Sequence, residues 1–145
     1  MNIDLEKIQS MWEKDSNIDI DNLHLESLKI PSLHSKYYEI YNNFILLKKK
    51  ADQDKKIKLL DRYKYYTGKS PAEVYVEEPF PYKIRDKDAL QKYLDGDEHI
   101  LKLNMKIEYY NTVLDYLTDI IKMLNNRSYQ IKNSIEYMKF HSGIS

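Results

Sequence analysis

The sequence of 145 residues has no cysteine and three glycines, Gly68, Gly96 and Gly143. Without cysteine the chain forms neither a disulfide framework nor a thiolate zinc site, which favours a reducing compartment. The glycines lie too far apart for the loops that bring backbone close to a phosphate, a dinucleotide or a nucleophilic serine. We therefore expect a mainly α-helical protein without nucleotide chemistry.

Long apolar runs are missing as well. No stretch approaches the ~20 residues that a membrane-spanning helix needs, and residues 1–14 lack the basic start and apolar core of a signal peptide. Both absences favour the cytoplasm and no membrane partner.

Side chains for catalysis or metal binding are poorly placed. The histidines show neither an HExxH pattern nor a paired-ligand spacing. The acidic residues around Asp97 indicate the start of a helix. Those around Asp19 indicate caps rather than a calcium loop, because no bidentate glutamate follows at the required distance. We expect no enzyme, no catalytic residue, no metal site and no cofactor.

Charge is plentiful but unevenly distributed. The 23 basic and 23 acidic side chains cancel, yet residues 1–28 carry a net charge of −5, residues 48–71 carry +6 and residues 72–98 carry −4. A partner responds to the local field rather than to the average. The basic block at 48–71 is therefore the first candidate for a binding surface.

Apolar spacing predicts two helices before this block ends. Residues 4–14 form a short amphipathic pattern. Residues 18–30 are ambiguous: a short helix over 22–29 fits, and Pro31 would stop it. Ser32 would then cap a second, long helix.

The long helix is predicted over residues 33–67, with Gly68 ending it in the left-handed conformation. It would be about 50 Å long, too long to be buried in a monomer of this size. Beyond it, Val74, Tyr75 and Val76 favour a strand, and the nearby prolines favour a loop or hairpin over a helix. Residues 86–94 predict a short helix.

The C-terminal third has the clearest periodicity, with apolar residues in alternating steps of four and three that make a heptad seam. A second apolar stripe beside it widens the face beyond a dimer seam. Residues 125–128 either end one helix, with a second helix over residues 128–141, or lie within a single continuous helix. In each case other elements or other copies must cover the face, and we expect oligomerisation here. The residues we expect to carry it are Leu114, Leu117, Ile121, Leu124, Ile131, Ile135 and Met138.

The sharpest feature of the basic block is IKLLDRYKYYTGKS, residues 57–70. Cations interleaved with flat aromatic rings suit single-stranded nucleic acid, because basic side chains neutralise phosphates and aromatic rings stack on unpaired nucleobases. The plainer alternative is a solvated lysine-rich helix whose tyrosines pack inward. Candidate phosphate ligands are Lys58, Arg62, Lys64 and Lys69. Tyr65 and Tyr66 would stack on bases or pack, and Thr67 would donate to a phosphate or cap the helix.

Residues 62–69 resemble the basic, tyrosine-paired motif of the UvsY recombination mediators of T-even-like bacteriophages: an arginine, two residues, Tyr-Tyr, Ser or Thr, Gly and a base. The likeness extends to the opening residues 5–19 and to the ending Tyr129–Lys132, followed by Phe140 and Gly143. One position departs from the family pattern: Leu60 stands where the family has a lysine. Lys58 and Lys64 are the candidates to replace that lysine.

The resemblance implies a function that the residues alone do not specify. Members of the family bind single-stranded DNA cooperatively as ring-shaped homo-oligomers (hexamers or heptamers). They contact a single-strand DNA-binding protein and a RecA-like recombinase, and they help to load the recombinase onto covered strands. The implied setting is phage recombination and repair in the cytoplasm of the infected bacterial host.

Together these features predict long helices that form an antiparallel helical protomer with a short loop or hairpin insertion, assembled into a ring. Residues 1–71 would hold the DNA-binding motif, residues 72–98 an acidic insertion, and residues 99–145 the oligomerisation region. The alternative is a helical oligomeric adaptor or structural protein that never touches nucleic acid.

Overall fold

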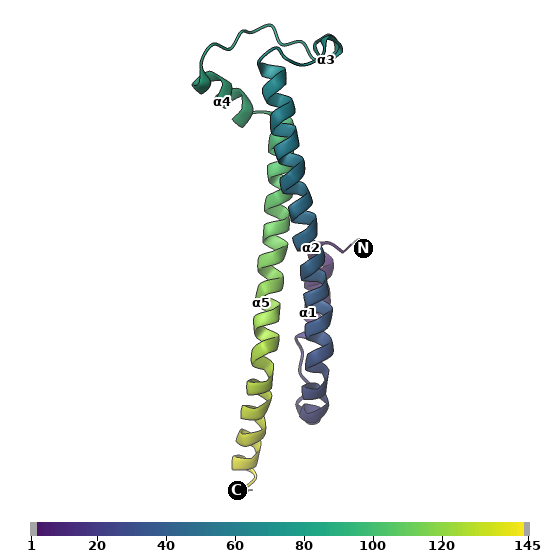
Figure 1. The fold of residues 1–145 in the computed structure, drawn as a ribbon. Helices are drawn as coiled ribbons and strands as arrows, with labels where there is room; N and C mark the ends of the chain where they lie inside the picture. The colour runs from purple at the N-terminus through teal and green to yellow at the C-terminus, as the bar shows by residue number, and fades with distance from the viewer. Residues whose placement is uncertain (1–2, 144–145) are drawn as a thin grey trace. The chain divides into compact units, whose positions relative to one another are not determined.

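The computed structural model describes residues 3–143 and is helical throughout its regular elements (Figure 1). The helices, in chain order, are α1 (Leu5–Asp15), a 3₁₀ turn (Ile20–Asn22), α2 (Leu23–Tyr66), α3 (Ala72–Glu77), α4 (Lys87–Asp95) and α5 (Glu98–His141). Within the described residues there is no strand. The expectation of a mainly α protein is confirmed.

The chain divides into two compact units. The terminal unit consists of α1, the 3₁₀ turn, residues 23–44 of α2 and the part of α5 from residue 112 onward. The central unit consists of residues 45–111, which include the end of α2, all of α3 and α4, and the start of α5. In each unit the segments of α2 and α5 run antiparallel (Figure 1).

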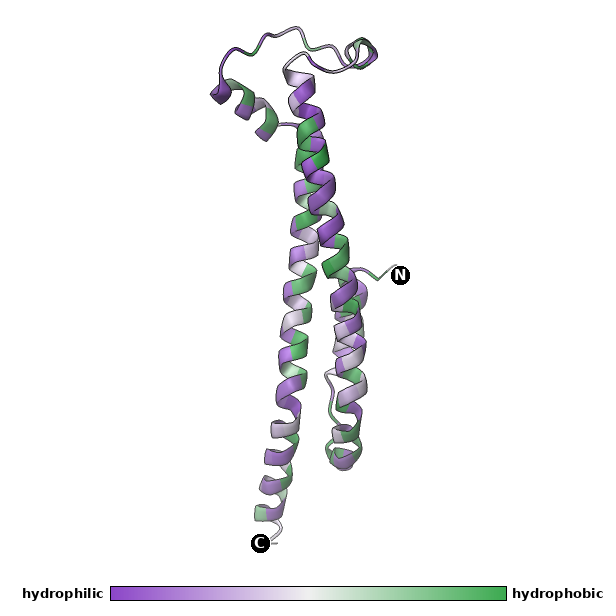
Figure 2. Cartoon of the chain, in the orientation of Figure 1, coloured by the Kyte–Doolittle hydropathy of each residue, from purple (hydrophilic) through white to green (hydrophobic). Residues whose placement is uncertain are grey.

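The terminal unit is held by an apolar core from three helices. Its fully buried side chains include Ile8 of α1, Tyr37 of α2, and Leu117 and Leu124 of α5. Each contributes about 1.5–3 kcal/mol relative to an exposed side chain. Hydrophobic and hydrophilic residues alternate in bands along α2 and α5, as expected of helices with one apolar side (Figure 2).

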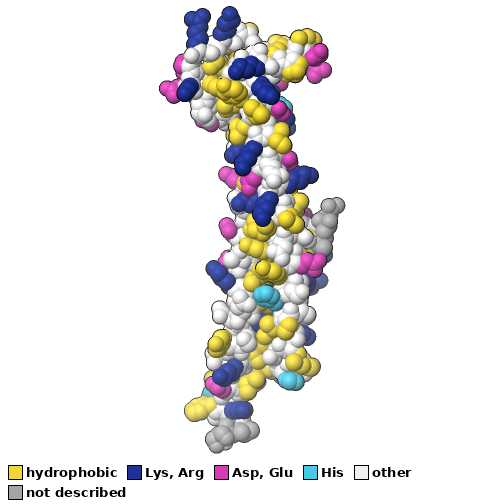
Figure 3. All heavy atoms as spheres, in the orientation of Figure 1, with side chains coloured by type: hydrophobic (Ala, Val, Ile, Leu, Met, Phe, Trp, Pro, Cys, Tyr) yellow, Lys and Arg dark blue, Asp and Glu magenta, His cyan; other side chains and the backbone are white. Residues whose placement is uncertain are grey.

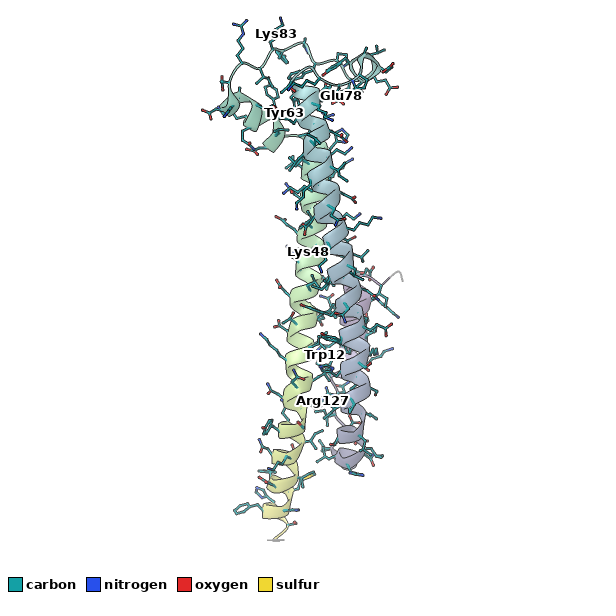
Figure 4. The ribbon with its side chains drawn as sticks, in the orientation of Figure 1. Trp12, Lys48, Tyr63, Glu78, Lys83 and Arg127 are labelled. Carbon is teal, nitrogen blue, oxygen red and sulfur yellow. The ribbon has the colours of Figure 1, made fainter. Side chains whose placement is uncertain are left out.

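A polar cluster fastens α1 inside this unit. The Tyr37 hydroxyl donates to Asp15 Oδ2 at 2.7 Å, and the ring of Tyr37 meets that of Trp12 edge-on at 5.5 Å. Arg127 of α5 lies 5.5 Å from the ring centre of Trp12 and donates to the carbonyl oxygens of Asp15 and Ser16 (Figure 4). A cation is thus placed at the carbonyl end of α1, where the helix dipole favours it.

Two expected elements are wrong. Pro31 does not stop a helix: α2 passes through it, and the Ser32 hydroxyl donates to the Lys29 carbonyl within the helix instead of capping a new one. An interior proline costs about 3 kcal/mol, and burial of Tyr37 and Ile40 farther along the same helix offsets it. Of the two alternatives left open for residues 125–128, the structure shows the second, because α5 passes through them.

The predicted strand at Val74–Val76 is also wrong, because these residues lie in α3. Val76 is exposed and finds no neighbouring strand. Tyr75 instead turns its hydroxyl to the Tyr65 carbonyl at 2.8 Å, near the end of α2. This contact, made across ten residues, overrides the local preference for strand.

Candidate nucleic-acid interface

The end of α2 is fixed by a glycine turn. Gly68 has φ +78°, and the amide of Gly68 donates to the Tyr65 carbonyl at 3.3 Å while that of Lys69 donates to the Lys64 carbonyl at 2.8 Å. This pair of hydrogen bonds is the Schellman motif that satisfies the last carbonyls of a helix. The position of Gly68 was therefore predicted correctly. The chain turns here and carries Lys69 back beside the helix.

Five side chains lock this helix end to the rest of the central unit. Arg62, only 8% exposed, donates from Nε to Asp97 Oδ2 at 2.6 Å and from its terminal nitrogens to Glu78 at 3.0 and 3.3 Å. The Tyr66 hydroxyl donates to the same Asp97 oxygen at 2.6 Å. The guanidinium also lies 4.2 Å from the ring centre of Tyr65. One cation thus joins α2, the residue after α3 and the start of α5.

The ionisation of this cluster is fixed by its own contacts. Burial alone would raise the pKa of Asp97, but hydrogen bonds from Tyr66 and Arg62 hold it below its usual value. Its other carboxylate oxygen accepts the amides of His99 and Ile100, and so caps α5. Burial would lower the pKa of Arg62, and the hydrogen bonds to Glu78 and Asp97 raise it instead. The cluster stays charged at neutral pH.

Three lysines surround a hollow beside this cluster. Lys58, Lys64 and Lys69 line a cavity of about 600 Å³ together with Arg62, and two acidic residues, Asp61 and Glu78, also line it. Lys64 and Lys69 are exposed, and Lys69 Nζ lies 5.5 Å from the ring centre of Tyr63. Within residues 3–143 none of these lysines is paired with a carboxylate. Their charges are available to an anion.

The remaining candidate residues of the motif are Tyr65, Tyr66 and Thr67, and each has partners within the central unit. Tyr65 is 3% exposed, stacks on Tyr75 at 5.4 Å and donates to the Glu78 carbonyl at 2.9 Å. Tyr66 is half-buried, and the Thr67 hydroxyl donates to the Tyr63 carbonyl at 2.8 Å. In the unbound chain, these tyrosines pack and Thr67 caps.

Sequence reasoning missed the residues that complete the site. Glu78 and Asp97 pair with Arg62 from 16 and 35 residues away, and no local sequence pattern predicts either ion pair. In the loop between α3 and α4, the ring of Phe80 lies 5.1 Å from that of Tyr66, and the ring of Tyr82 lies 5.6 Å from that of Phe80. The high tyrosine content was the only available signal.

The residues expected to carry oligomerisation fall into two groups. Most of them lie in the core of the terminal unit, where Leu117 and Leu124 are fully buried against the chain's own helices. This buried or half-buried group consists of Leu114, Leu117, Ile121, Leu124 and Ile131. The second group, Ile135 and Met138, is exposed at 36% and 44%.

The described part of the chain offers neither a metal cluster nor a membrane-spanning helix. Among residues 3–143, no group of three histidine or acidic side chains is placed to hold a metal ion. No helix within that range is long and apolar enough to cross a bilayer.

Comparison with known proteins gives a consistent match. The family model described as "Recombination, repair and ssDNA binding protein UvsY" matches residues 11–144. The recombination protein uvsY of Enterobacteria phage T4 is 23% identical over 139 residues, which cover 96% of this chain and 98% of that protein. Two crystal structures of the bacteriophage T4 recombination mediator protein UvsY share the fold. Lattice type II gives a TM-score of 0.84 at 23% identity, covering 97% of this chain and 99% of that one. Lattice type IV gives 0.81 at 22% identity, with 96% and 99% covered.

Proposed function

Because the chain belongs to the UvsY family, we propose that it is a recombination mediator that binds single-stranded DNA and promotes loading of a RecA-like recombinase onto strands covered by single-strand-binding protein. The family description names binding, recombination and repair rather than a reaction. This agrees with a protein that is not an enzyme. Its setting would be the cytoplasm of the infected bacterium.

The observation that carries the proposal is the hollow in which Lys58, Lys64 and Lys69 outnumber the one acid, Asp61, that is not paired with Arg62. Three ammonium groups without carboxylate partners in the described residues form a surface that attracts a phosphate chain. The buried Arg62 cluster behind them holds the helix end that presents two of the three. We assign direct phosphate contact to the lysines, and to Arg62 the positioning of the surface from which they project.

Self-association is part of the proposal. Near the end of α5, large apolar side chains point to solvent, among them Tyr137 at 65% and Phe140 at 82% exposed. Further copies of the chain would cover them, in a ring of the six or seven protomers that the family resemblance implies. A weak phosphate site repeated on one strand gains avidity without any new contact. The ring would therefore hold DNA far more tightly than one protomer.

Binding can be tested with a labelled strand. The chain should prefer a single strand to a duplex, and the triple variant Lys58→Ala/Lys64→Ala/Lys69→Ala should bind at least tenfold more weakly at moderate salt. The matched control removes three exposed lysines of the terminal unit, Lys7, Lys14 and Lys122. Equal losses in the two triple variants would refute the lysine hollow as the binding surface, and no preference for a single strand over a duplex would favour the adaptor that does not recognise nucleic acid.

Mediation needs a separate assay. On a strand covered by single-strand-binding protein, the recombinase must displace that protein before it can form a filament, so we expect filament formation to begin after a delay. Addition of the chain should shorten the delay, and the triple lysine variant should shorten it less. A delay unchanged by the chain would refute mediation while leaving DNA binding intact.

A further inference from the structure

A second cavity lies in the central unit and shares Tyr65 with the lysine hollow. Most of the residues that line it lie outside the motif at residues 62–69. It measures about 370 Å³, within the usual range of small-ligand sites. Tyr66 and Thr67 contribute from the end of α2, and the loop between α3 and α4 contributes Phe80 and Tyr82. The loop segment Pro79–Arg85 contains two cations and no acid. Hydrophobic side chains flanked by lysine and arginine gather on this part of the surface (Figure 3).

The rings of this cavity are held in place by one another. Phe80 meets Tyr66 at 5.1 Å and Tyr82 at 5.6 Å, both nearly edge-on. Tyr82 is stacked on Tyr93 of α4 at 6.5 Å. Despite these contacts Tyr82 remains 64% exposed. The loop therefore offers a flat aromatic surface that is already ordered, which lowers the entropy cost of binding.

Proline restricts the backbone on both sides of Phe80. Pro79 and Pro81 have fixed φ angles, and each also restricts the residue before it. The loop has fewer conformations to lose when a ligand binds. Ring positions set by proline and by neighbouring rings thus lower the conformational cost of binding.

The polar groups at the cavity edge are unused. In the described residues, Lys83 and Arg85 have no carboxylate partner, and no hydrogen bond is made by the Tyr82 hydroxyl. Lys83 projects outward from the loop (Figure 4). Cations beside a flat aromatic surface match one nucleotide of an unpaired strand, whose base stacks while the flanking phosphates are neutralised.

We propose that this cavity is a nucleobase site, which takes one unpaired base of the bound strand on the exposed ring of Tyr82, with Lys83 and Arg85 on the neighbouring phosphates. The site rests on the proposed DNA binding and extends it. The lysine hollow holds the backbone without regard to bases, and the aromatic cavity distinguishes a strand with exposed bases from one whose bases are paired. A duplex offers no base to it.

The test compares two strands of equal length, a thymidine oligonucleotide and one whose sugars carry no bases. The wild-type chain should bind the thymidine strand roughly tenfold or more tightly than the abasic strand, because a base–aromatic stack contributes a factor of this order. Tyr82→Leu should reduce that ratio at least threefold, whereas Tyr82→Phe, which keeps the ring, should preserve it. The Lys83→Ala/Arg85→Ala variant should weaken binding of both strands alike.

The outcomes separate this site from the proposed function. If the wild type binds both strands but Tyr82→Leu leaves their ratio unchanged, the base site is refuted and DNA binding stands. If the wild type binds neither strand, DNA binding fails and the base site fails with it. Melting curves of Tyr82→Leu and Tyr82→Phe must coincide, so that the ratio reports the ring and not folding. If only Tyr82→Leu is destabilised, Tyr82 is a packing residue and the base site is refuted.

Discussion

At the residue scale, Arg62 both stabilises the end of α2 and lines the hollow that holds the three lysines. Its guanidinium is shared by two carboxylates, the fully buried Asp97 and the half-exposed Glu78. Removal of one partner from a buried ion pair typically costs about 3–5 kcal/mol, whereas the intact pair adds little net stability. The cluster therefore specifies where the end of α2 lies, and the three lysines beside it supply the net positive charge.

Asp97 gives this cluster a pH signature. Since the pKa of Asp97 is lowered in the folded chain, its ionised form stabilises the fold above the unfolded value of about 3.9. This stability is lost as the pH falls through the lower, folded value. Between about pH 5 and pH 3 the melting temperature of the wild type should fall more than that of Asp97→Asn, which has no carboxylate to protonate. Asp15, whose pKa is also lowered, is common to both proteins, so parallel curves would contradict the role of Asp97.

Gly68 is predicted to be the more sensitive of two helix-ending glycines. A Cβ at Gly68 would meet no atom within 4 Å, but φ +78° is unfavourable for alanine, so Gly68→Ala should cost about 1 kcal/mol. Gly96→Ala is the matched control, because Gly96 has φ −93° and its Cβ would make only an ordinary contact at 3.5 Å. Thermal melts of the two variants measure the difference. A larger loss at Gly96 would contradict the assigned turn.

At the element scale, α5 changes from buried to exposed apolar residues along its length. As far as Ile131 it buries leucine and isoleucine against its own chain, and beyond that residue the side chains are exposed. A heptad pattern describes both parts equally well, because burial inside one chain and burial between chains need the same apolar spacing.

This division predicts different outcomes for charged substitutions along α5. Ile135→Asp/Met138→Asp should dissociate the oligomer and leave helix content unchanged, because both residues are exposed in one protomer. Leu117→Asp should instead unfold the terminal unit, since a fully buried leucine is lost and a charge is buried. Sedimentation velocity and circular dichroism distinguish the two results. An intact oligomer in the double variant would place the interface elsewhere.

Arg127 is expected to control how firmly α1 is held. Its side chain is 3% exposed, and its second terminal nitrogen has no partner in the structure, so its bonds to the Asp15 and Ser16 carbonyls are its main compensation. Arg127→Ala should remove these bonds and the contact with Trp12, at a cost of roughly 1–3 kcal/mol. Hydrogen exchange should then accelerate over residues 5–15 more than over α4. Uniform acceleration would contradict a local role.

The sequence sufficed where structure is set by neighbours along the chain. The helix near residues 4–14, the helix near 86–94 and the turn at Gly68 follow from apolar spacing, caps and one glycine. It failed at Pro31 and at Val74–Val76, where packing from distant residues overrides local preference. At the site, the binding role of the lysines stays a prediction from charge, and the partners of Arg62 depend on contacts made only after folding.

At the scale of the whole molecule, the net charge of zero hides the fact that the two units carry different kinds of surface. The central unit carries the unpaired lysines and the aromatic loop, and the terminal unit carries the exposed apolar end of α5. If copies associate through the terminal unit, each adds one positively charged site, while the neutral total limits indiscriminate attraction to other nucleic acids. Affinity then depends on assembly as well as on the lysines.

The most direct test of the central claim is the salt dependence of single-strand affinity for the assembled protein. Each phosphate neutralised by a lysine contributes about 0.7 to the slope of log affinity against log salt concentration. Lys58→Ala/Lys64→Ala/Lys69→Ala should therefore flatten the slope by about 2 for each protomer engaged, and the Lys7, Lys14 and Lys122 control should leave it unchanged. An identical slope for the wild type and both triple variants would contradict the claim that the lysine hollow binds the strand.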